Sequence, residues 1–244
     1  MILVTGAAGG IGSAIGRTVV AAGGTAILHD SRADAVASLA RELGPAASSI
    51  TSDLGDPAAV AALWATAFDR HGRIDVLVNN ASVFLDASLD LGLDDWVETW
   101  NRTLSVNLLA PAILCRAAIG SYASQSGGGI IINVASVTAH RGANADRWPY
   151  GAAKGGLTSM TRTIARFYGR QGVTAFVVAP GFVDTPMSRT ILDEEGIQAA
   201  AAVTGLGEMT QPRDVADVIA LLATGRARHA TGTTIDVNAA GYCR

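Results

Sequence analysis

The sequence contains few of the residues that mark several protein classes. Two of its 244 residues are cysteines, Cys115 and Cys243, which is too few for a disulfide framework, so we expect a reducing compartment. Lysine occurs once, at Lys154, and the net charge is −3, from 18 basic and 21 acidic residues. A nucleic-acid-binding protein is normally basic, and we therefore expect no nucleic-acid partner.

Long uninterrupted apolar segments are also missing. The chain starts MILVTG, without the basic residues that open a secretory signal. The apolar stretch 104–119 is broken by Asn107, Pro111 and Arg116, so it falls short of the roughly 20 apolar residues that span a membrane. We therefore expect a soluble, cytoplasmic protein without a membrane partner.

The composition favours a densely packed chain, because 49% of the residues are hydrophobic and 16% are charged. Short runs rich in Ile and Val alternate with longer alanine-rich stretches. The short runs predict strands at 2–4, 25–28, 49–51, 76–78, 130–134, 175–178 and 234–237. The longer stretches predict helices at 11–22, 33–43, 57–71, 95–124, 149–168 and 212–222.

The order of these elements predicts the fold. Strands that are apolar at consecutive positions are buried on both faces, as in a parallel sheet covered by helices. Alternating strands and helices then indicate an α/β protein with a doubly wound, Rossmann-type parallel sheet of about seven strands in a single domain, residues 1–244. The segment 186–211 has no clear strand pattern, so we expect a lid over a binding site.

A glycine-rich turn follows the first predicted strand and opens the first predicted helix. It reads TGAAGGIG from Thr5 to Gly12. Glycines let a phosphate approach the backbone, and the N–H groups at a helix start favour negative charge. The strict G-x-G-x-x-G spacing is absent, because residue 15 is Ile15. The strand–turn–helix context favours a dinucleotide site, with a purely structural turn as the alternative.

Asp30 ends the second predicted strand, 18 residues after Gly12 (30 − 12). An acidic residue about 20 residues after such a turn can accept hydrogen bonds from the adenosine ribose. A carboxylate there would repel a 2′-phosphate, which favours NAD over NADP. NADP remains the alternative, because Arg32 could reach a phosphate, and Asp30 could instead be a helix N-cap.

Tyr150 and Lys154 have the spacing of neighbours on one helix face. A free tyrosine, with a pKa near ~10, is a poor acid–base group at neutral pH, and a nearby cation lowers that pKa. A surface pair is the alternative. However, every other Lys or Arg position in the chain is arginine, whose larger group does not replace lysine in such a site.

Taken together, these motifs resemble the short-chain dehydrogenases/reductases that lack a separate substrate domain. The similarity extends from Thr5 to about Asn238 and includes the family's T-G-x-x-x-G-x-G pattern. The resemblance places the catalytic tetrad at Asn107, Ser136, Tyr150 and Lys154. It places cofactor contacts at Gly6, Gly10, Ile11, Gly12, Asp30, Asp53, Leu54, Asn80, Ala81, Tyr150, Lys154, Pro180, Gly181, Val183 and Thr185.

The resemblance also implies a role for each residue, with no metal site. Tyr150 would exchange a proton with the substrate oxygen, and Lys154 would lower the Tyr150 pKa and bind the nicotinamide ribose. Ser136 would fix the substrate oxygen, Asn107 would hold a water in a proton relay, and Thr185 would orient the carboxamide. The alternatives are a strand-end cap for Ser136, a buried amide for Asn107 and a helix cap for Thr185.

The sequence departs from the family pattern at two places. Ser82 replaces the glycine of the N-N-A-G motif, which would strain the backbone if that position required a positive φ. The gap from Ser136 to Tyr150 is 14 residues (150 − 136), one more than we expect, and it contains the insertion DRW at 146–148. Trp148 could line the substrate cleft or pack under the inserted loop.

The substrate is expected to be a ketone or secondary alcohol in an apolar pocket. Its expected walls are Phe84, Trp148, Phe182 and Met187. A 3-oxoacyl group on an acidic carrier protein is the alternative, and it would need a basic docking surface. The resembling region, 120–129, has no Lys or Arg, although Arg141, Arg147 and Arg170 lie elsewhere.

Two further functions compete with an oxidoreductase, namely a dinucleotide-binding sensor and a sugar-nucleotide epimerase or dehydratase. A complete tetrad disfavours the sensor, and the lack of extra length after Val183 disfavours the epimerase. Related enzymes form tetramers through the helices that hold the tetrad. A homo-tetramer is therefore expected, with small residues on one helix face at Ala152, Gly155, Gly156 and Ser159.

Overall fold

Parallel strands form the centre of the computed structural model, which describes residues 1–125 and 127–244. The strands are β1 (Ile2–Thr5), β2 (Ala26–Asp30), β3 (Ala47–Thr51), β4 (Val76–Asn79), β5 (Gly129–Val134), β6 (Val173–Pro180) and β7 (Thr234–Val237). They lie in the order β3-β2-β1-β4-β5-β6-β7, and each neighbouring pair is parallel. The predicted doubly wound parallel sheet is therefore confirmed. The strand order reverses between β1 and β4, where such sheets bind ligands.

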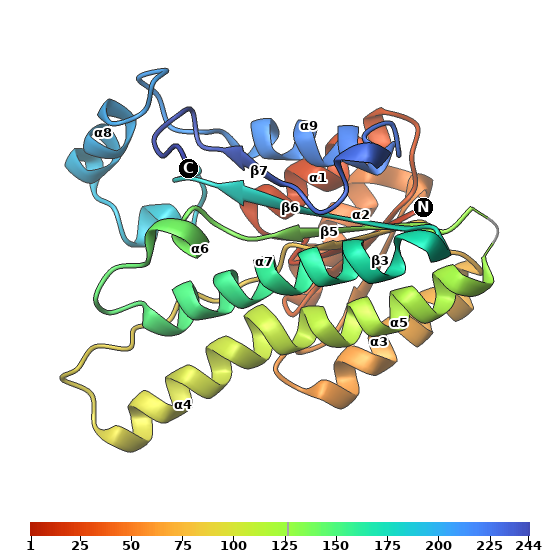
Figure 1. The fold of residues 1–244 in the computed structure, drawn as a ribbon, viewed down its shortest axis with the longest axis horizontal. Helices are drawn as coiled ribbons and strands as arrows, with labels where there is room; N and C mark the ends of the chain where they lie inside the picture. Colours follow the sequence, from red (N-terminus) through yellow and green to blue (C-terminus); the bar gives the residue numbers. More distant parts are fainter. Residues whose placement is uncertain (126) are drawn as a thin grey trace.

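Helices cover both faces of the sheet (Figure 1). The longer helices are α1 (Gly10–Ala21), α2 (Ala33–Leu43), α3 (Pro57–His71), α4 (Leu93–Leu104), α5 (Ala110–Ser124), α7 (Trp148–Tyr168) and α9 (Pro212–Ala223). One buried cluster joins α1, α2 and α9 to the sheet, and a second joins α3, α5 and α7 to the opposite face. The fully apolar strands are buried between these two clusters, as their consecutive apolar residues predict.

The predicted helix at 95–124 is longer than expected and is not uniform. It runs from Leu93 to Ser124 as α4, a π-helical turn at Ser105–Leu109, and α5. Among the described residues it is long and apolar enough to cross a membrane, with a mean hydropathy of 1.5 in its most apolar window, of which 44% is buried. Core helices meet the same test, and this one packs against α3 and α7.

Two helices were not predicted, α6 (Thr138–Arg141) and α8 (Glu194–Ala202). α8 begins after Asp193, whose carboxylate accepts a hydrogen bond from the Gly196 N–H at 2.8 Å. This acidic start followed by alanines is a helix signal. It was missed because α8 buries none of its residues and so has no apolar periodicity.

The segment 186–211, expected to be a lid, begins and ends at one point of the fold. Val183 pairs with Thr210 in an isolated parallel bridge, and the Asp184 N–H donates to the Thr210 carbonyl at 2.9 Å. Figure 1 shows α8 standing apart from the sheet, at the end where the strands finish. The segment is thus attached at its ends and exposed along α8.

Candidate active site

A cleft of about 870 Å³ lies at the carboxyl ends of the strands. All fifteen residues predicted to contact a cofactor line it, and so do three of the four tetrad residues. The exception is Asn107, which is not part of the cleft wall. The reversal of strand order thus brings residues 6–12, 80–82, 150–154 and 180–185 to one cavity.

The glycine turn takes a backbone path that side chains would block. Gly6 has φ +66°, and a Cβ there would lie 2.7 Å from Cα of Ala81. A Cβ on Gly12 would lie 2.1 Å from the Gly6 carbonyl oxygen. α1 starts at Gly10 with no acidic residue in its first turn, so no side chain of that turn competes for its N–H groups and positive dipole end. This cradle fits the phosphates of a dinucleotide.

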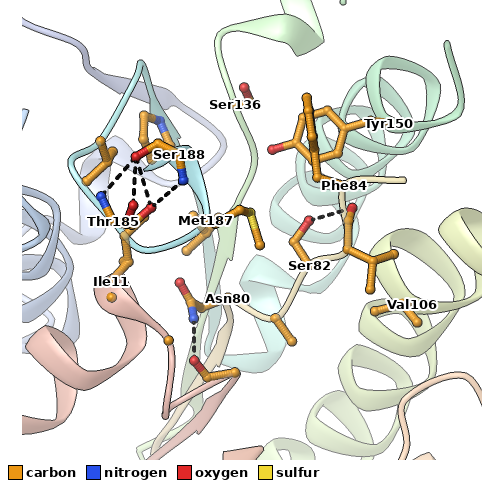
Figure 2. Close-up of a pocket in the computed structure, with 18 of the residues that line it drawn as sticks. Ile11, Asn80, Ser82, Phe84, Val106, Ser136, Tyr150, Thr185, Met187 and Ser188 are labelled. Atoms are coloured by element: carbon orange, nitrogen blue, oxygen red, sulfur yellow. Dashed lines mark hydrogen bonds between the residues drawn. The ribbon is translucent and has the colours of Figure 1, made fainter. Parts of the chain in front are cut away.

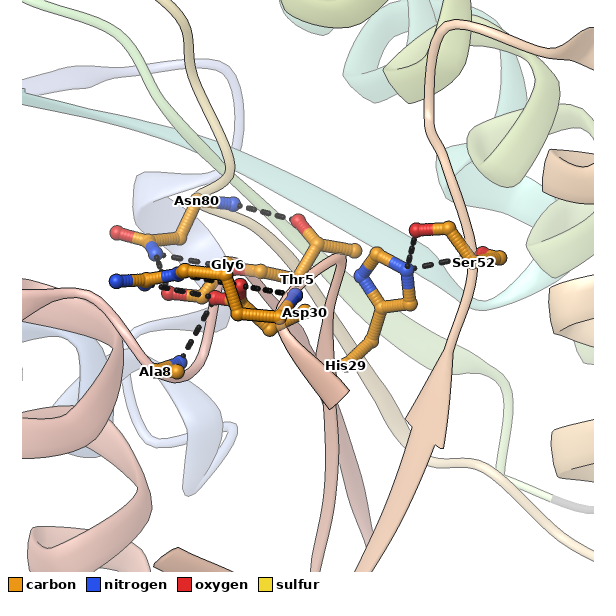
Figure 3. Close-up of polar contacts among 8 residues, drawn as sticks. Thr5, Gly6, Ala8, His29, Asp30, Ser52 and Asn80 are labelled. Carbon is orange, nitrogen blue, oxygen red and sulfur yellow. Dashed lines mark hydrogen bonds and ion pairs between the residues drawn. The ribbon is translucent and has the colours of Figure 1, made fainter. Parts of the chain in front are cut away.

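Thr5 and Asn80 fasten this turn to the chain that follows β4 (Figure 3). The Thr5 hydroxyl oxygen accepts hydrogen bonds from the N–H groups of Asn80 and Ala81 at 3.0 and 3.1 Å. The Asn80 amide donates to the carbonyls of Thr5 and Gly6 at 2.9 and 3.2 Å. Asn80, predicted to contact a cofactor, therefore also holds the shape of the cleft floor.

Asp30 lines the adenosine end of the cleft, but its carboxylate is already hydrogen-bonded. It accepts from the Ala8 N–H at 3.0 Å, from the Arg32 N–H at 3.1 Å, and from the Arg32 guanidinium at 3.0 and 3.3 Å. Burial acts to raise the pKa of Asp30, and these hydrogen bonds from Arg32 and Ala8 outweigh it and lower the pKa. Asp30 is therefore ionised, and Arg32 occupies the place where ribose hydroxyls were expected.

Asp53 is also paired with an arginine rather than left open for adenine. Its two carboxylate oxygens accept from the Arg102 guanidinium at 2.8 and 3.0 Å. A Cβ on Gly55 would lie 1.6 Å from Nη1 of Arg102, so glycine at this position lets the arginine cross the turn. Arg102, which the sequence analysis did not single out, lines the cleft. No local pattern links it to Asp53, because the pair is 49 residues apart.

The Tyr150 hydroxyl points into the cleft toward Ser136 (Figure 2). Burial raises the pKa of Tyr150, while polar contact with the hydroxyls of Ser136 and Ser82 acts to lower it. The expectation of a lowered Tyr150 pKa is therefore wrong for the protein by itself, because the loss of water around the phenol outweighs its polar neighbours. The geometry nevertheless brings Tyr150 and Ser136 together at one wall.

Lys154 lies below the phenol and is 2% exposed. Its Nζ donates to the Val134 carbonyl at 2.9 Å and lies 5.5 Å from the centroid of the Tyr150 ring. Burial lowers the pKa of Lys154 to about 8. The lysine thus shares the cavity with the phenol, as the four-residue spacing predicts, and the alternative of a surface pair is wrong.

Asn107 lies outside the cleft wall and pairs with the backbone of Val83. It is fully buried in the π-helical turn. Its amide oxygen accepts from the Val83 N–H and its amide nitrogen donates to the Val83 carbonyl, each at 2.8 Å. This pairing uses one lone pair of the amide oxygen and one of its two N–H donors, so the side chain holds the chain after β4 as a buried amide. The expected water relay stays a prediction.

The chain is similar to known proteins over nearly its whole length. A family model described as enoyl-(acyl carrier protein) reductase matches residues 6–242. The 3-oxoacyl-(acyl-carrier-protein) reductase FabG of Vibrio harveyi is 34% identical, over 98% of this chain and 96% of the relative. The short-chain reductase protein NovJ of Streptomyces niveus is 37% identical, over 97% of this chain and 91% of the relative. A solved short-chain dehydrogenase/reductase from Brucella melitensis, titled glucose/ribitol dehydrogenase, has a TM-score of 0.90 and 31% identity. The match covers 100% of this chain and 96% of the solved chain.

The chain belongs to the short-chain dehydrogenase/reductase family. It is an oxidoreductase that transfers hydride between a nicotinamide cofactor and a carbonyl or alcohol group. The relatives are reductases or dehydrogenases by name, so they give no support to the alternatives of a binding sensor or an epimerase.

The departures from the family pattern have clear structural outcomes. Among the described residues, Ala239 and Ala240 are the non-glycine residues with positive φ, so Ser82 carries no such strain. Trp148 does not line the cleft. Its ring lies 6.4 Å from that of Trp96 in an edge-to-face contact, which decides for packing over substrate contact.

The substrate side of the cleft is more polar than expected. Phe84, Phe182 and Met187 line it as predicted. Beside them lie the polar side chains of Arg141, Asn144, Asp146, Arg147 and Thr190. The insertion at 146–148 contributes Asp146 and Arg147 to this wall, and Arg141 and Asn144 come from the preceding segment.

The region 120–129, which has no Lys or Arg, is partly helical. α5 continues through Ser124, and Ser126 lies outside the described residues. Gly129 begins β5, so residues 127–129 lie at the amino ends of the strands (Figure 1), whereas the cleft is lined by residues that follow the strands. A partner seated there would not reach Tyr150.

Ser188 is a further residue that the sequence analysis missed. Its hydroxyl accepts from the Thr185 N–H at 3.0 Å and donates to the Thr185 carbonyl at 2.9 Å. A Cβ on Gly10 would lie 2.7 Å from Cγ2 of Thr185. Ser188 thus fixes Thr185 against the glycine turn (Figure 2). A Thr-x-x-Ser pattern at the start of a short helix is the signal that could have identified it.

Proposed function

We propose that Tyr150 is the general acid–base of this enzyme and that its substrate is a ketone or secondary alcohol with an apolar body. The supporting observation is the Tyr150 hydroxyl facing Ser136 inside the cleft, with the Lys154 ammonium 5.5 Å from the phenol ring. On reduction, Tyr150 gives its proton to the carbonyl oxygen, and on oxidation it takes the proton from the alcohol. A nicotinamide cofactor, when bound, supplies or accepts the hydride.

The neighbouring residues support this role. Ser136 holds the substrate oxygen beside the phenol, and Lys154 binds the nicotinamide ribose from the same cavity. Because the pKa of Lys154 is about 8, the ammonium form predominates at neutral pH. Thr185 and the backbone of Val183 face the place of the carboxamide from the opposite wall. Binding orients the reactants, which is the main contribution of such a site.

The activity experiment compares the wild type with Tyr150→Phe. We expect oxidation of NADH or NADPH with at least one member of a ketone panel, and a loss of at least a hundredfold in kcat for the variant. Binding of the reduced cofactor, measured by its fluorescence, should stay within about threefold of wild type because the variant lacks one hydroxyl. Unchanged turnover in the variant would refute the role of Tyr150.

We also propose NAD as the preferred cofactor. Asp30 is ionised and lies at the end of β2, where a 2′-phosphate would meet its negative charge. Arg32 covers the carboxylate, but its side chain is 61% exposed, so it can turn away into water at little cost. The ribose hydroxyls then take the place of the guanidinium on Asp30.

Fluorescence titration with NADH and NADPH tests the cofactor proposal. Wild type should bind NADH at least tenfold more tightly than NADPH, because the Asp30 carboxylate and the 2′-phosphate carry like charges that repel in a partly buried site. Asp30→Ala should remove that preference. Arg32→Ala should weaken the binding of NADPH and leave the affinity for NADH unchanged. Tighter binding of NADPH by wild type would overturn the assignment and give Arg32 the role of phosphate ligand.

A second candidate is reduction of 3-oxoacyl thioesters on an acyl carrier protein. It is favoured by the 34% identity to the Vibrio harveyi reductase of that name. Arg141 lines the cleft and is exposed, so it offers one cation at the entrance. Comparing an acetoacetyl carrier protein with acetoacetate esters separates the two candidates. A preference of at least a hundredfold for the carrier-bound form would establish the second.

The remaining expectations complete this proposal. The enzyme works in the cytoplasm as a homo-tetramer, and the segment 186–211 closes over bound substrate. The segment is attached at both ends and contributes Pro186, Met187 and Ile191 to the cleft wall. Slower proteolysis within 186–211 when cofactor and product are both present would support closure.

A further inference from the structure

Phe84 lies in the segment between β4 and α4, which two contacts hold in place. The Asn107 amide binds both backbone groups of Val83 at 2.8 Å each. Four residues later, the Ala87 N–H donates to the Asp146 carbonyl at 2.8 Å. Phe84 lies between these two anchors and lines the cleft. Its ring therefore has a fixed place next to the catalytic wall.

This ring contacts both Tyr150 and Arg147. The centroids of the Phe84 and Tyr150 rings are 4.8 Å apart, with an interplanar angle of 77° (Figure 2). The guanidinium carbon of Arg147 lies 4.8 Å from the Phe84 centroid, which is within the range of a cation–π contact. Edge-to-face aromatic pairs have a preferred geometry, so Phe84 connects the position of the arginine to that of the phenol.

Arg147 is itself held by two carboxylates. Its side chain is 14% exposed, and its Nη1 lies 2.8 Å from Asp146 and 3.4 Å from Asp86. Its backbone carbonyl accepts from the Gly151 N–H at 3.2 Å, at the start of the helix that carries Tyr150. Two carboxylates offset the single positive charge. Arg147 is therefore better suited to fix a ring than to attract an anionic substrate.

We propose that Arg147 and Phe84 are positioning residues for Tyr150: the guanidinium holds the phenylalanine ring, and that ring holds the phenol with its hydroxyl toward Ser136. The inference rests on the proposed role of Tyr150 in proton transfer. Arg147 belongs to the insertion before α7, so it gives that insertion a function in catalysis. A misplacement of about 1 Å can cost up to a hundredfold in rate, which is the effect that this stack prevents.

Kinetics of a double-mutant cycle test the proposal. Arg147→Met and Phe84→Ala are each expected to lower kcat about tenfold, and the double variant should lose no more than Phe84→Ala alone, because the arginine acts through the ring. Arg147→Lys keeps the charge and should recover part of the loss. Losses that multiply in the double variant would overturn the proposal.

Arg166→Met is the matched control, because the Arg166 guanidinium lies 5.6 Å from the ring of Phe167, which is 66% exposed on the same helix. The Arg166→Met substitution removes a cation–π contact that lies away from the cleft, so kcat should stay at the wild-type value. If Arg147→Met behaves like this control, the proposal fails. Thermal melting of every variant confirms that it is folded.

A titration of Tyr150 provides a readout that needs no substrate. Two charged groups lie near the phenol. The Lys154 ammonium faces the Tyr150 ring directly, and the Arg147 guanidinium lies on the far side of the Phe84 ring. Phe84→Ala leaves both charges in place and admits water, and since burial raises the pKa of Tyr150, this pKa should fall. It is measured from tyrosinate absorbance, as the difference between each protein and the same protein with Tyr150→Phe.

The titration also separates this inference from the proposed function. An unchanged Tyr150 pKa in Phe84→Ala would overturn the positioning role, even if Tyr150 proves essential for turnover. Conversely, full activity of Tyr150→Phe would refute the proposed function, while a lowered pKa would still establish that Phe84 shields the phenol.

Discussion

At the residue scale, Lys154 illustrates how surroundings decide the chemistry of a side chain. Its identity as the single lysine and its four-residue spacing from Tyr150 are properties of the sequence. Its pKa of about 8 is not, because that value comes from burial. A depressed lysine pKa means that the charged form is less stable in the folded protein than in the unfolded chain.

This difference predicts a specific dependence of stability on pH. The unfolded chain holds its proton up to the ordinary lysine pKa of 10.5, whereas the folded protein releases it near 8. Wild type should therefore gain about 2–3 kcal/mol in free energy of unfolding, relative to Lys154→Met, between pH 7 and pH 10. Urea unfolding of both proteins across this range measures it. If the free energy of unfolding changed with pH by the same amount in both proteins, the result would contradict the desolvation of Lys154.

At the element scale, the helices and strands follow from patterns along the chain. Pro57 and Pro212 begin α3 and α9 as expected of proline in a first turn. β6 extends to Val173–Pro180, beyond its predicted range, because it pairs with β5 and β7 on its two sides. The π-helical turn at Ser105–Leu109 has no such local signal. It depends on Val83, which is 24 residues away from Asn107.

Replacing Asn107 tests the function of that turn. Asn107→Leu leaves the N–H and carbonyl of Val83 buried without a partner, so we expect a loss of about 2–4 kcal/mol in free energy of unfolding. The matched control is Asn101→Leu, an exposed position on α4, which should change stability by less than about 0.5 kcal/mol. Equal stability of the two variants in urea would contradict the anchoring role of Asn107.

At the scale of the whole molecule, the proposed tetramer needs an exposed apolar surface, and the α4–α5 helix offers one. Leu93 is 74% exposed, and Val97 and Leu109 are 41% and 46% exposed, all along the α4–α5 helix. The expected face of small residues on α7 is only partly free, because a Cβ on Gly156 would lie 3.1 Å from Leu108 of the same chain. We therefore expect the α4–α5 helix to contribute to the interface beside α7.

Light scattering should give about four chains per particle. Leu93→Glu should shift the particle toward smaller species, because a charge in an apolar interface is costly. Val203→Glu is the control, since Val203 is 70% exposed beside α8, away from this helix. A wild-type monomer, or an equal effect of both variants, would contradict the tetramer.

The sequence by itself determined the order of the elements, the parallel sheet and the positions of the glycine turn, Tyr150 and Lys154. These depend on periodicity and on spacing within one helix or turn, which act over a few residues. Only the tertiary structure decided that Asp53 is paired with Arg102, that Asn107 holds Val83, and that Arg147 stacks on Phe84. Each of these contacts joins residues that are far apart in the sequence. Each therefore depends on how the folded chain brings distant segments together.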